Sequence, residues 1–172
     1  MSYDLRLFSI PEGVEPEAAY EQLIHREESE IADINDRVKR SLPDSTRATM
    51  QQLAEVIRTR WPSFVQFQPA SALPWIELND DDLQIQFAVY ERMASITMPY
   101  FREPTTQLME CIRCCLNACR EERGYVAYDP QLGRVVTVNE LGQIAQQYRD
   151  VDKALPSLRG HAPKTKPWWK FW

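Results

Sequence analysis

The stretch WIELNDDDLQIQFAVYERMASITMPYF, at residues 75–101, decides the fold, because apolar and polar side chains alternate through most of its length. An alternation with a period of two residues is typical of a β-strand that buries one of its two faces. The alternation covers residues 83–90 and 94–101, and Ile76 and Leu78 carry it upstream. The stretch therefore predicts three antiparallel strands that share one apolar face.

The register of these strands follows if Glu91 and Arg92 form a two-residue turn. Apolar side chains then lie opposite apolar side chains, whereas a shift of one strand by one residue would set apolar against polar at every position. The predicted pairs are Val89–Ala94, Phe87–Ile96, Ile85–Met98 and Leu83–Tyr100 and, across a loop at residues 79–82, Leu78–Leu83 and Ile76–Ile85.

The other face of the three strands is polar and nearly uncharged, and the indole ring of Trp75 belongs to it. Antiparallel sheets often expose one face to water, which is one interpretation of this pattern. An aromatic ring among hydrogen-bonding side chains is also common in protein-binding surfaces. We predict a partner-binding surface on this face, formed by Trp75, Glu77, Gln84, Gln86 and Thr97.

The rest of the chain supplies further strands and the helices that cover the apolar face. Helices are marked by apolar residues at a spacing of three and four, and the helix at residues 106–123 has the widest apolar arc. The other predicted elements are a strand at 3–10, helices at 16–42 (one, or two joined near Ser29) and 44–61, a hairpin around 129–133 and a last helix that ends at 155–156.

These elements predict an α+β fold: a single domain with a mainly antiparallel sheet of about six strands and helices packed on one face. The domain would span residues 1–156, and residues 157–172 would form a basic aromatic C-terminal tail. The chain has no apolar run near the ~18 residues of a membrane span, and its N-terminus lacks the pattern of a signal peptide. We therefore expect a cytoplasmic protein.

Charge is distributed unevenly along the chain. Residues 12–36 are strongly acidic, and no acid follows Asp152. Free aromatic rings in the basic tail would form a costly apolar patch, so we expect them to dock on a surface. The surface could be the acidic helix of the same chain, a neighbouring subunit in a homo-oligomer or a separate partner, and the complementary charges favour the first two. So short a basic segment argues against nucleic acid as a partner and against a membrane anchor. The aromatic residues predicted to bind are Trp168, Trp169, Phe171 and Trp172.

Catalytic, cofactor and metal sites have no recognisable pattern in this sequence. The four cysteines fall in one predicted helix, which cannot supply the tetrahedral ligands of zinc, so we interpret them as free packing thiols. His25 and His161 have no evident Asp or Ser partner for hydrolysis. The acidic loop at residues 79–82 is too short for a known calcium loop. We predict no cofactor and no enzymatic activity.

Two segments resemble small uncharacterised bacterial cytosolic proteins. One is MSYDL at residues 1–5, followed by an acidic helix, and the other is GYVAYDPQ at residues 124–131. Some proteins of this type are immunity proteins that neutralise bacterial toxins, so the resemblance implies a bacterial protein that binds another protein. It transfers no functional residue, because both segments are structural.

We therefore predict a non-catalytic protein-binding protein, of the immunity type, that uses its acidic and polar-sheet surfaces. The alternative is a small enzyme whose active site comes together only in three dimensions. A pocket that gathers Asp, Glu or His with perturbed pKa values would favour the enzyme, whereas a flat acidic or aromatic patch would favour the binding protein.

Overall fold

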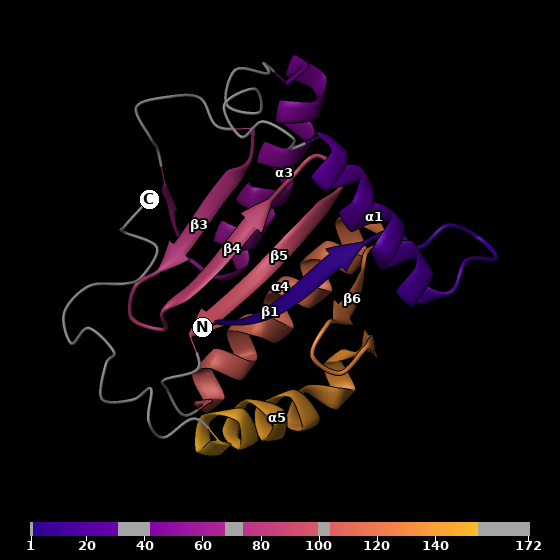
Figure 1. The fold of residues 1–172 in the computed structure, drawn as a ribbon. Coiled ribbons are helices and arrows are strands. Elements are labelled where there is room, and N and C mark those ends of the chain that lie inside the picture. Colours follow the sequence, from indigo (N-terminus) through magenta and orange to yellow (C-terminus); the bar gives the residue numbers. More distant parts are fainter. Residues whose placement is uncertain (1, 31–41, 68–73, 100–103, 155–172) are drawn as a thin grey trace.

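A computed structural model describes residues 2–30, 42–67, 74–99 and 104–154, and Figure 1 shows them as one sheet with helices on its two faces. The elements are β1 (Ser2–Phe8), α1 (Pro16–Glu30), α3 (Asp44–Arg60), β2 (Val65–Phe67), β3 (Ile76–Asp80), β4 (Ile85–Val89), β5 (Met93–Pro99), α4 (Thr106–Arg123), β6 (Val126–Asp129), β7 (Arg134–Val136), a 3-10 turn (Val138–Glu140) and α5 (Leu141–Ala154).

The sheet has seven antiparallel strands in the order β2-β3-β4-β5-β1-β6-β7. The first strand of the chain thus lies near the centre, between β5 and β6. The predicted α+β domain with a mainly antiparallel sheet is confirmed. The structure adds β2, which lies in a segment that we predicted as a loop, because three residues are too few to show a period of two.

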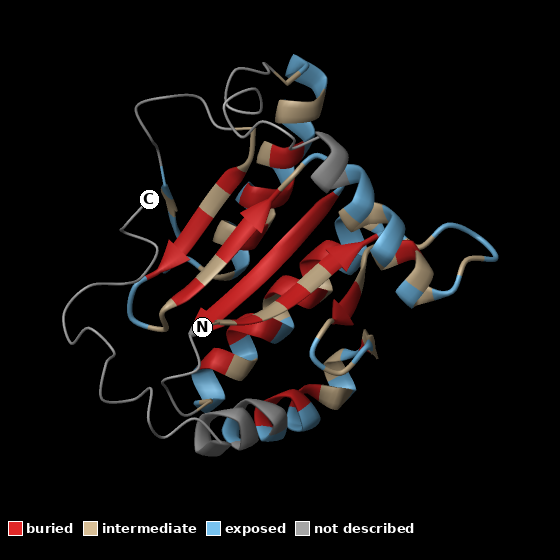
Figure 2. Ribbon diagram, in the orientation of Figure 1, coloured by how far each residue is buried: buried red, intermediate tan, exposed pale blue. Residues whose placement is uncertain are grey.

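The main core lies between the sheet and the helices α3, α4 and α5. Leu5, Phe87 and Ile96 are fully buried on this face of the sheet, and Figure 2 shows burial concentrated in the central strands and the helix sides that face them. Within the described residues, no helix is long and apolar enough to cross a membrane.

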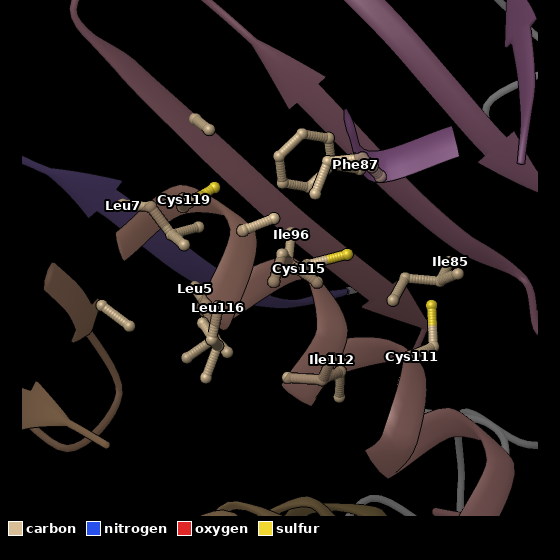
Figure 3. Close-up of a cluster of buried hydrophobic side chains, with 14 of the residues drawn as sticks. Leu5, Leu7, Ile85, Phe87, Ile96, Cys111, Ile112, Cys115, Leu116 and Cys119 are labelled. Carbon is tan, nitrogen blue, oxygen red and sulfur yellow. The ribbon is translucent and has the colours of Figure 1, made fainter. Parts of the chain in front are cut away.

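The helix α4 lies across the sheet with local signals at both ends. The Thr105 side chain accepts a hydrogen bond of 3.1 Å from the Leu108 backbone N–H, which satisfies one of the free donors of the first turn. Gly124 ends the helix at a φ of 62°, a left-handed conformation that favours glycine. Cys111, Cys115 and Cys119 point from α4 towards the strands (Figure 3).

The helix α1 packs on the other face of the sheet, which corrects the prediction that all helices share one face. Its Ala19 is buried in a second, smaller cluster with Phe8, Met93 and Tyr128, whose side chains alternate away from the main core. Tyr20 of α1 stacks on Tyr128, with ring centroids 4.7 Å apart. An amphipathic stripe shows that a helix buries one side but not which face of a sheet receives it.

The predicted β4–β5 register is confirmed. Phe87 pairs with Ile96 and Val89 pairs with Ala94, and the Tyr90 backbone N–H donates to the Met93 carbonyl across the turn. The ladder ends at Gln86–Thr97, one position before the predicted Ile85–Met98 pair. Tyr100 of the last predicted pair lies outside the described residues.

The predicted β3–β4 register is wrong by four residues. Leu78 pairs with Phe87, not Leu83, and Ile76 pairs with Val89, not Ile85. The connecting loop is residues 81–84, so that Leu83 lies in a turn. Because four is an even number, the apolar residues keep the same face, and the alternation alone could not distinguish the two registers.

Asp80 explains the register that the chain adopts. Its buried carboxylate accepts hydrogen bonds from the Trp61 indole N–H at 3.0 Å, from the Ser63 hydroxyl and from the Leu83 backbone N–H at 2.9 Å. These donors hold Asp80 at the end of β3, opposite Ile85. The loop that we placed at residues 79–82 therefore begins two residues later.

Candidate binding face

The sheet side that faces away from α3, α4 and α5 carries a block of mainly polar residues on β3, β4, β5 and β1, which we call the polar face, although Asn79, Ser95 and Thr97 within it are buried. Pairing across the strands aligns these residues in two rows. The first row runs Glu77–Ala88–Ser95–Arg6, and the second runs Asn79–Gln86–Thr97–Asp4. In Figure 1, α1 lies over one end of this side, and no other described helix covers it.

Apolar side chains border the polar face at the edge strand β2. Val65 pairs with Asn79 and Phe67 pairs with Glu77, so both project on the same side as the two rows. The side chain of Val65 is 68% exposed and that of Phe67 is 44% exposed. They are the large hydrophobic side chains most open to solvent in the described chain.

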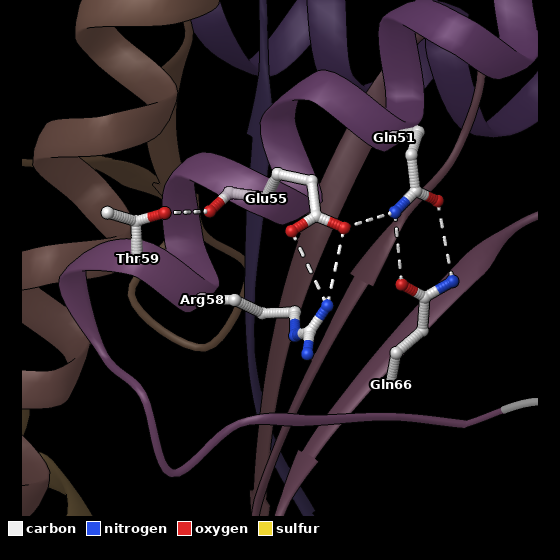
Figure 4. A network of polar contacts seen from close by, with 5 residues as sticks. All are labelled: Gln51, Glu55, Arg58, Thr59 and Gln66. Carbon is white, nitrogen blue, oxygen red and sulfur yellow. Dashed lines mark hydrogen bonds and ion pairs between the residues drawn. The ribbon is translucent and has the colours of Figure 1, made fainter.

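The position of β2 is secured by α3 on the opposite side of the strand. Gln66 and Gln51 exchange side-chain hydrogen bonds of 3.2 and 3.4 Å, and Gln51 also donates to Glu55 at 2.7 Å (Figure 4). Because Gln66 is held against α3, its neighbours Val65 and Phe67 must face the other way. The exposure of Val65 and Phe67 therefore follows from the way in which the edge strand is fixed against α3.

An aromatic pair borders the polar face at the end nearest α1. The rings of Trp75 and Tyr90 are 6.3 Å apart at an interplanar angle of 37°. Tyr90 also packs against the cluster that α1 covers. The polar face thus has an apolar border on two sides and continues into α1.

Two buried polar atoms on this face have no hydrogen-bond partner. They are the Arg6 side-chain Nε and the Asn79 Oδ1 atom. The Asn79 amide nitrogen is used, since it donates to Glu77 at 2.9 Å, and Asn79 as a whole is 9% exposed. A buried donor or acceptor without a partner costs roughly 1–3 kcal/mol. Both atoms are themselves buried, so these missing hydrogen bonds are a local cost to the fold and are not groups open to a bound molecule.

The exposed side of α1 is acidic. Glu17 and Glu21 are exposed. The pKa of the Tyr128 phenol is raised mainly by burial and, to a smaller extent, by the negative charges of these two glutamates. Glu12 and Glu15 of the preceding loop are also exposed. The border of the polar face beside α1 is consequently negative.

The structure places the described predicted binding residues in two different regions. Trp75, Glu77, Gln86 and Thr97 lie on one side of the sheet. Thr97 is buried, and the other three are half-buried. Gln84 does not belong to a strand, because it lies in the 81–84 turn with a φ of 54°. The aromatic tail residues lie outside the described residues: Trp168, Trp169, Phe171 and Trp172.

Sequence reasoning missed five residues of this region, namely Val65, Phe67, Tyr90, Arg6 and Asn79. The alternation of Val65 and Phe67 around Gln66 was the only signal of a strand there. Arg6 and Asn79 gain interest only from their unpaired atoms, which depend on neighbours that are distant in the sequence.

The described carboxylates with a shifted pKa have structural roles. Burial opposes ionisation of Asp80, but hydrogen bonds from Ser63, Leu83 and Trp61 outweigh it and lower its pKa. Hydrogen bonds from Arg134 and Thr137 lower the pKa of Glu140, which caps the turn before α5. Neither carboxylate lines the pockets of about 390 and 280 Å³ described at the other end of the sheet.

The cysteine side chains are free thiols, and those of Cys111, Cys115 and Cys119 are buried in the core. Burial raises the pKa of Cys119 to about 12 and that of Cys115 well above its ordinary value. Thiols with such values hold their protons at neutral pH and are poor nucleophiles. Among the residues that the structure describes, no three His, Cys, Asp or Glu side chains are grouped so as to hold a metal ion.

We expect the native protein to react slowly with an aromatic disulfide reagent at neutral pH. Only Cys114 is half-buried, so it should react first, while Cys111, Cys115 and Cys119 should react only after unfolding. The absorbance of the released thiolate, with and without guanidinium chloride, counts the accessible thiols. Fast reaction of two or more thiols in the native state would contradict the packing of α4. Elemental analysis of the same sample should show no stoichiometric zinc.

Comparison with known proteins gives no information about the candidate site, so its geometry is the basis for the function proposed below. No protein-family model, curated protein or solved structure matches this chain.

Proposed function

We propose that this protein is a non-catalytic binding protein whose polar face and α1 edge engage a folded protein with a cationic surface, in the manner of an immunity-type inhibitor. The exposed pair Val65 and Phe67, on the same side of the sheet as the polar face, is the observation that carries the proposal. Exposed apolar side chains bordered by polar side chains are typical of protein interfaces.

The size of the region indicates that α1 takes part. The polar face and its β2 border span five strands at ~4.8 Å and about five residues at ~3.3 Å, or roughly 400 Å² in projection. A stable interface covers ~800 Å² on each partner. The adjoining α1 has 15 residues, which at 1.5 Å each add about 22 Å of acidic surface. A partner that covers both would meet an interface of ordinary size.

Charge complementarity favours a cationic partner. The chain has a formal net charge of −5, and Glu17 and Glu21 are exposed on the side of α1 next to the aromatic cluster. Opposite charges at the border of an interface mainly accelerate association, and this effect weakens as salt is added. A toxin with a basic surface is a partner of this chemistry.

The proposal can be tested by photocrosslinking in the host cell. A benzoylphenylalanine placed at position 67 should form an adduct with one protein, whereas the same residue at position 52 should not. Gln52 is the matched control because it is also exposed but belongs to α3, behind the sheet. Adducts of equal yield at both positions, or at position 52 alone, would overturn the proposed face.

The purified partner then allows the contribution of single side chains to be measured. Phe67→Ala and Trp75→Ala should each weaken binding by about 30-fold, which corresponds to about 2 kcal/mol, the scale of an interface hot spot. Gln52→Ala should leave the affinity unchanged. The combined Glu17→Gln and Glu21→Gln variant should lower the association rate and its dependence on salt. Thermal melting confirms that each variant is folded.

A further inference from the structure

A second site lies at the end of the sheet beneath α1. It is a pocket of about 390 Å³, bounded by the end of β1, the inner side of α1, the β4–β5 turn and the residue before β6. The apolar wall of the pocket is formed by Phe8, Ala19 and Leu23. Two of these residues, Phe8 and Ala19, are buried in the cluster under α1. The pocket shares no residue with the polar face.

The rim of the pocket carries hydrogen-bond donors and positive charge. Arg26 of α1 and Arg92 of the β4–β5 turn both line it, together with Ser9, Gln22 and Tyr125. None of the lining residues is acidic, although the chain as a whole has an excess of acids. Within the described part of the chain, Arg92 has no ion-pair partner.

Tyr125 adds a neutral donor to this rim. Burial raises the pKa of its phenol, an effect that the nearby Arg123 only partly offsets. The hydroxyl therefore keeps its proton at neutral pH and can donate a hydrogen bond to an anion beside the two guanidinium groups.

We propose that this pocket binds a small carboxylic acid with an apolar body, of the arylacetate or short alkanoate class. A guanidinium group can bind both oxygens of a carboxylate at once, and arginines from two different elements, Arg26 and Arg92, line this pocket. The apolar body would displace water from the side chains of Phe8 and Leu23. Burial of this carbon surface favours binding, and a bare inorganic anion cannot gain it. The volume lies at the small end of ligand pockets, which suits about ten non-hydrogen atoms.

This inference goes beyond the proposed function, because the ligand is a small molecule and the site is separate from the polar face. Its occupancy would join α1, β1 and the β4–β5 turn. Binding to the folded state alone would therefore also raise the melting temperature.

The test uses the full chain and three probes: phenylacetate, its neutral analogue phenylacetamide, and inorganic phosphate. Titration followed by amide chemical shifts should show saturable binding of phenylacetate, with shifts at Ser9, Leu23 and Arg92. Phenylacetamide and phosphate should each bind at least tenfold more weakly, which corresponds to about 1.4 kcal/mol. The first lacks the charge and the second lacks the apolar body.

Substitutions of the two rim arginines test whether phenylacetate binds at the rim of this pocket. Arg92→Gln and Arg26→Gln should each weaken phenylacetate binding about tenfold or more, whereas Arg120→Gln should not. Arg120 is the matched control because it is an exposed arginine of α4 that does not line the pocket. Two separate rim variants keep the test decisive if one of them fails to fold. Equal binding of phenylacetamide or phosphate, unchanged affinity in both rim variants, or no saturable binding at millimolar concentrations would overturn the proposal.

Discussion

Phe87→Ala should lower the free energy of unfolding by about 3–5 kcal/mol, the usual cost of removing a fully buried phenylalanine. Phe87 is fully buried, and it lies between Leu78 and Ile96 in the sheet. Its ring also contacts that of Phe64, with centroids 6.5 Å apart. Alanine would leave a cavity at the point where β3, β4 and β5 meet the helices. Urea denaturation followed by circular dichroism measures the loss.

Gln86→Ala is the matched control for this prediction. Gln86 is one residue away on the same strand, but it belongs to the polar face and is only half-buried. A substitution at such a position usually changes stability by no more than ~0.5 kcal/mol. A larger loss for Gln86→Ala than for Phe87→Ala would mean that the two faces of β4 are exchanged.

Asp80→Ala should lower the free energy of unfolding by roughly 2–4 kcal/mol, because it leaves its hydrogen-bond donors without their charged acceptor. The donors are the Trp61 indole, the Ser63 hydroxyl and the backbone N–H groups of Leu83 and Asp82. The side chains of Asp82 and Asp81 are exposed in the adjoining turn. Asp82→Ala is therefore the control, with an expected change within ~0.5 kcal/mol.

The stabilisation by Asp80 should depend on pH in a defined direction. Its pKa in the folded state is lowered from the ordinary value of 3.8. A carboxylate with a lowered pKa stabilises the fold fully above its unfolded-state value and loses this effect as the pH falls towards the folded-state value. The stability difference between wild type and Asp80→Ala should thus be constant near neutral pH and shrink below about pH 3.8.

A different outcome at Asp80 would change the account of the β3–β4 register. If the difference between wild type and Asp80→Ala stayed constant through acid pH, the carboxylate would not be the group that holds the strand. Urea denaturation at several pH values, with Asp82→Ala measured in parallel, separates this case from a general effect of acid.

The two proposed sites make different demands on the same chain. The polar face with Val65 and Phe67 is broad and suits a protein surface, whereas the pocket with Arg26 and Arg92 is narrow and suits a small anion. Phe67→Ala and Arg92→Gln should therefore affect separate activities. Measuring each variant in both assays shows whether α1, which borders both sites, couples them.

Local pattern was enough to predict the β4–β5 hairpin and the ends of α4. The pairing of Phe87 with Ile96 follows from alternation around a two-residue turn, where few other registers are available to such a short loop. Thr105 and Gly124 mark the ends of α4 because their effects involve only the adjacent backbone. These features depend on residues that are close in the sequence.

Tertiary structure decided the β3–β4 register, the strand β2 and the side of the sheet on which α1 lies. A shift of four residues leaves the alternation of β3 and β4 unchanged, and the observed register is the one in which Asp80 ends β3 and accepts hydrogen bonds from Trp61 and Ser63. The strand β2 exists because β3 offers free backbone hydrogen bonds and Gln51 holds Gln66 in place. The periodicity of apolar residues in the sequence indicates which side chains are buried. It does not identify the residues that pack against them, because these lie in distant parts of the chain.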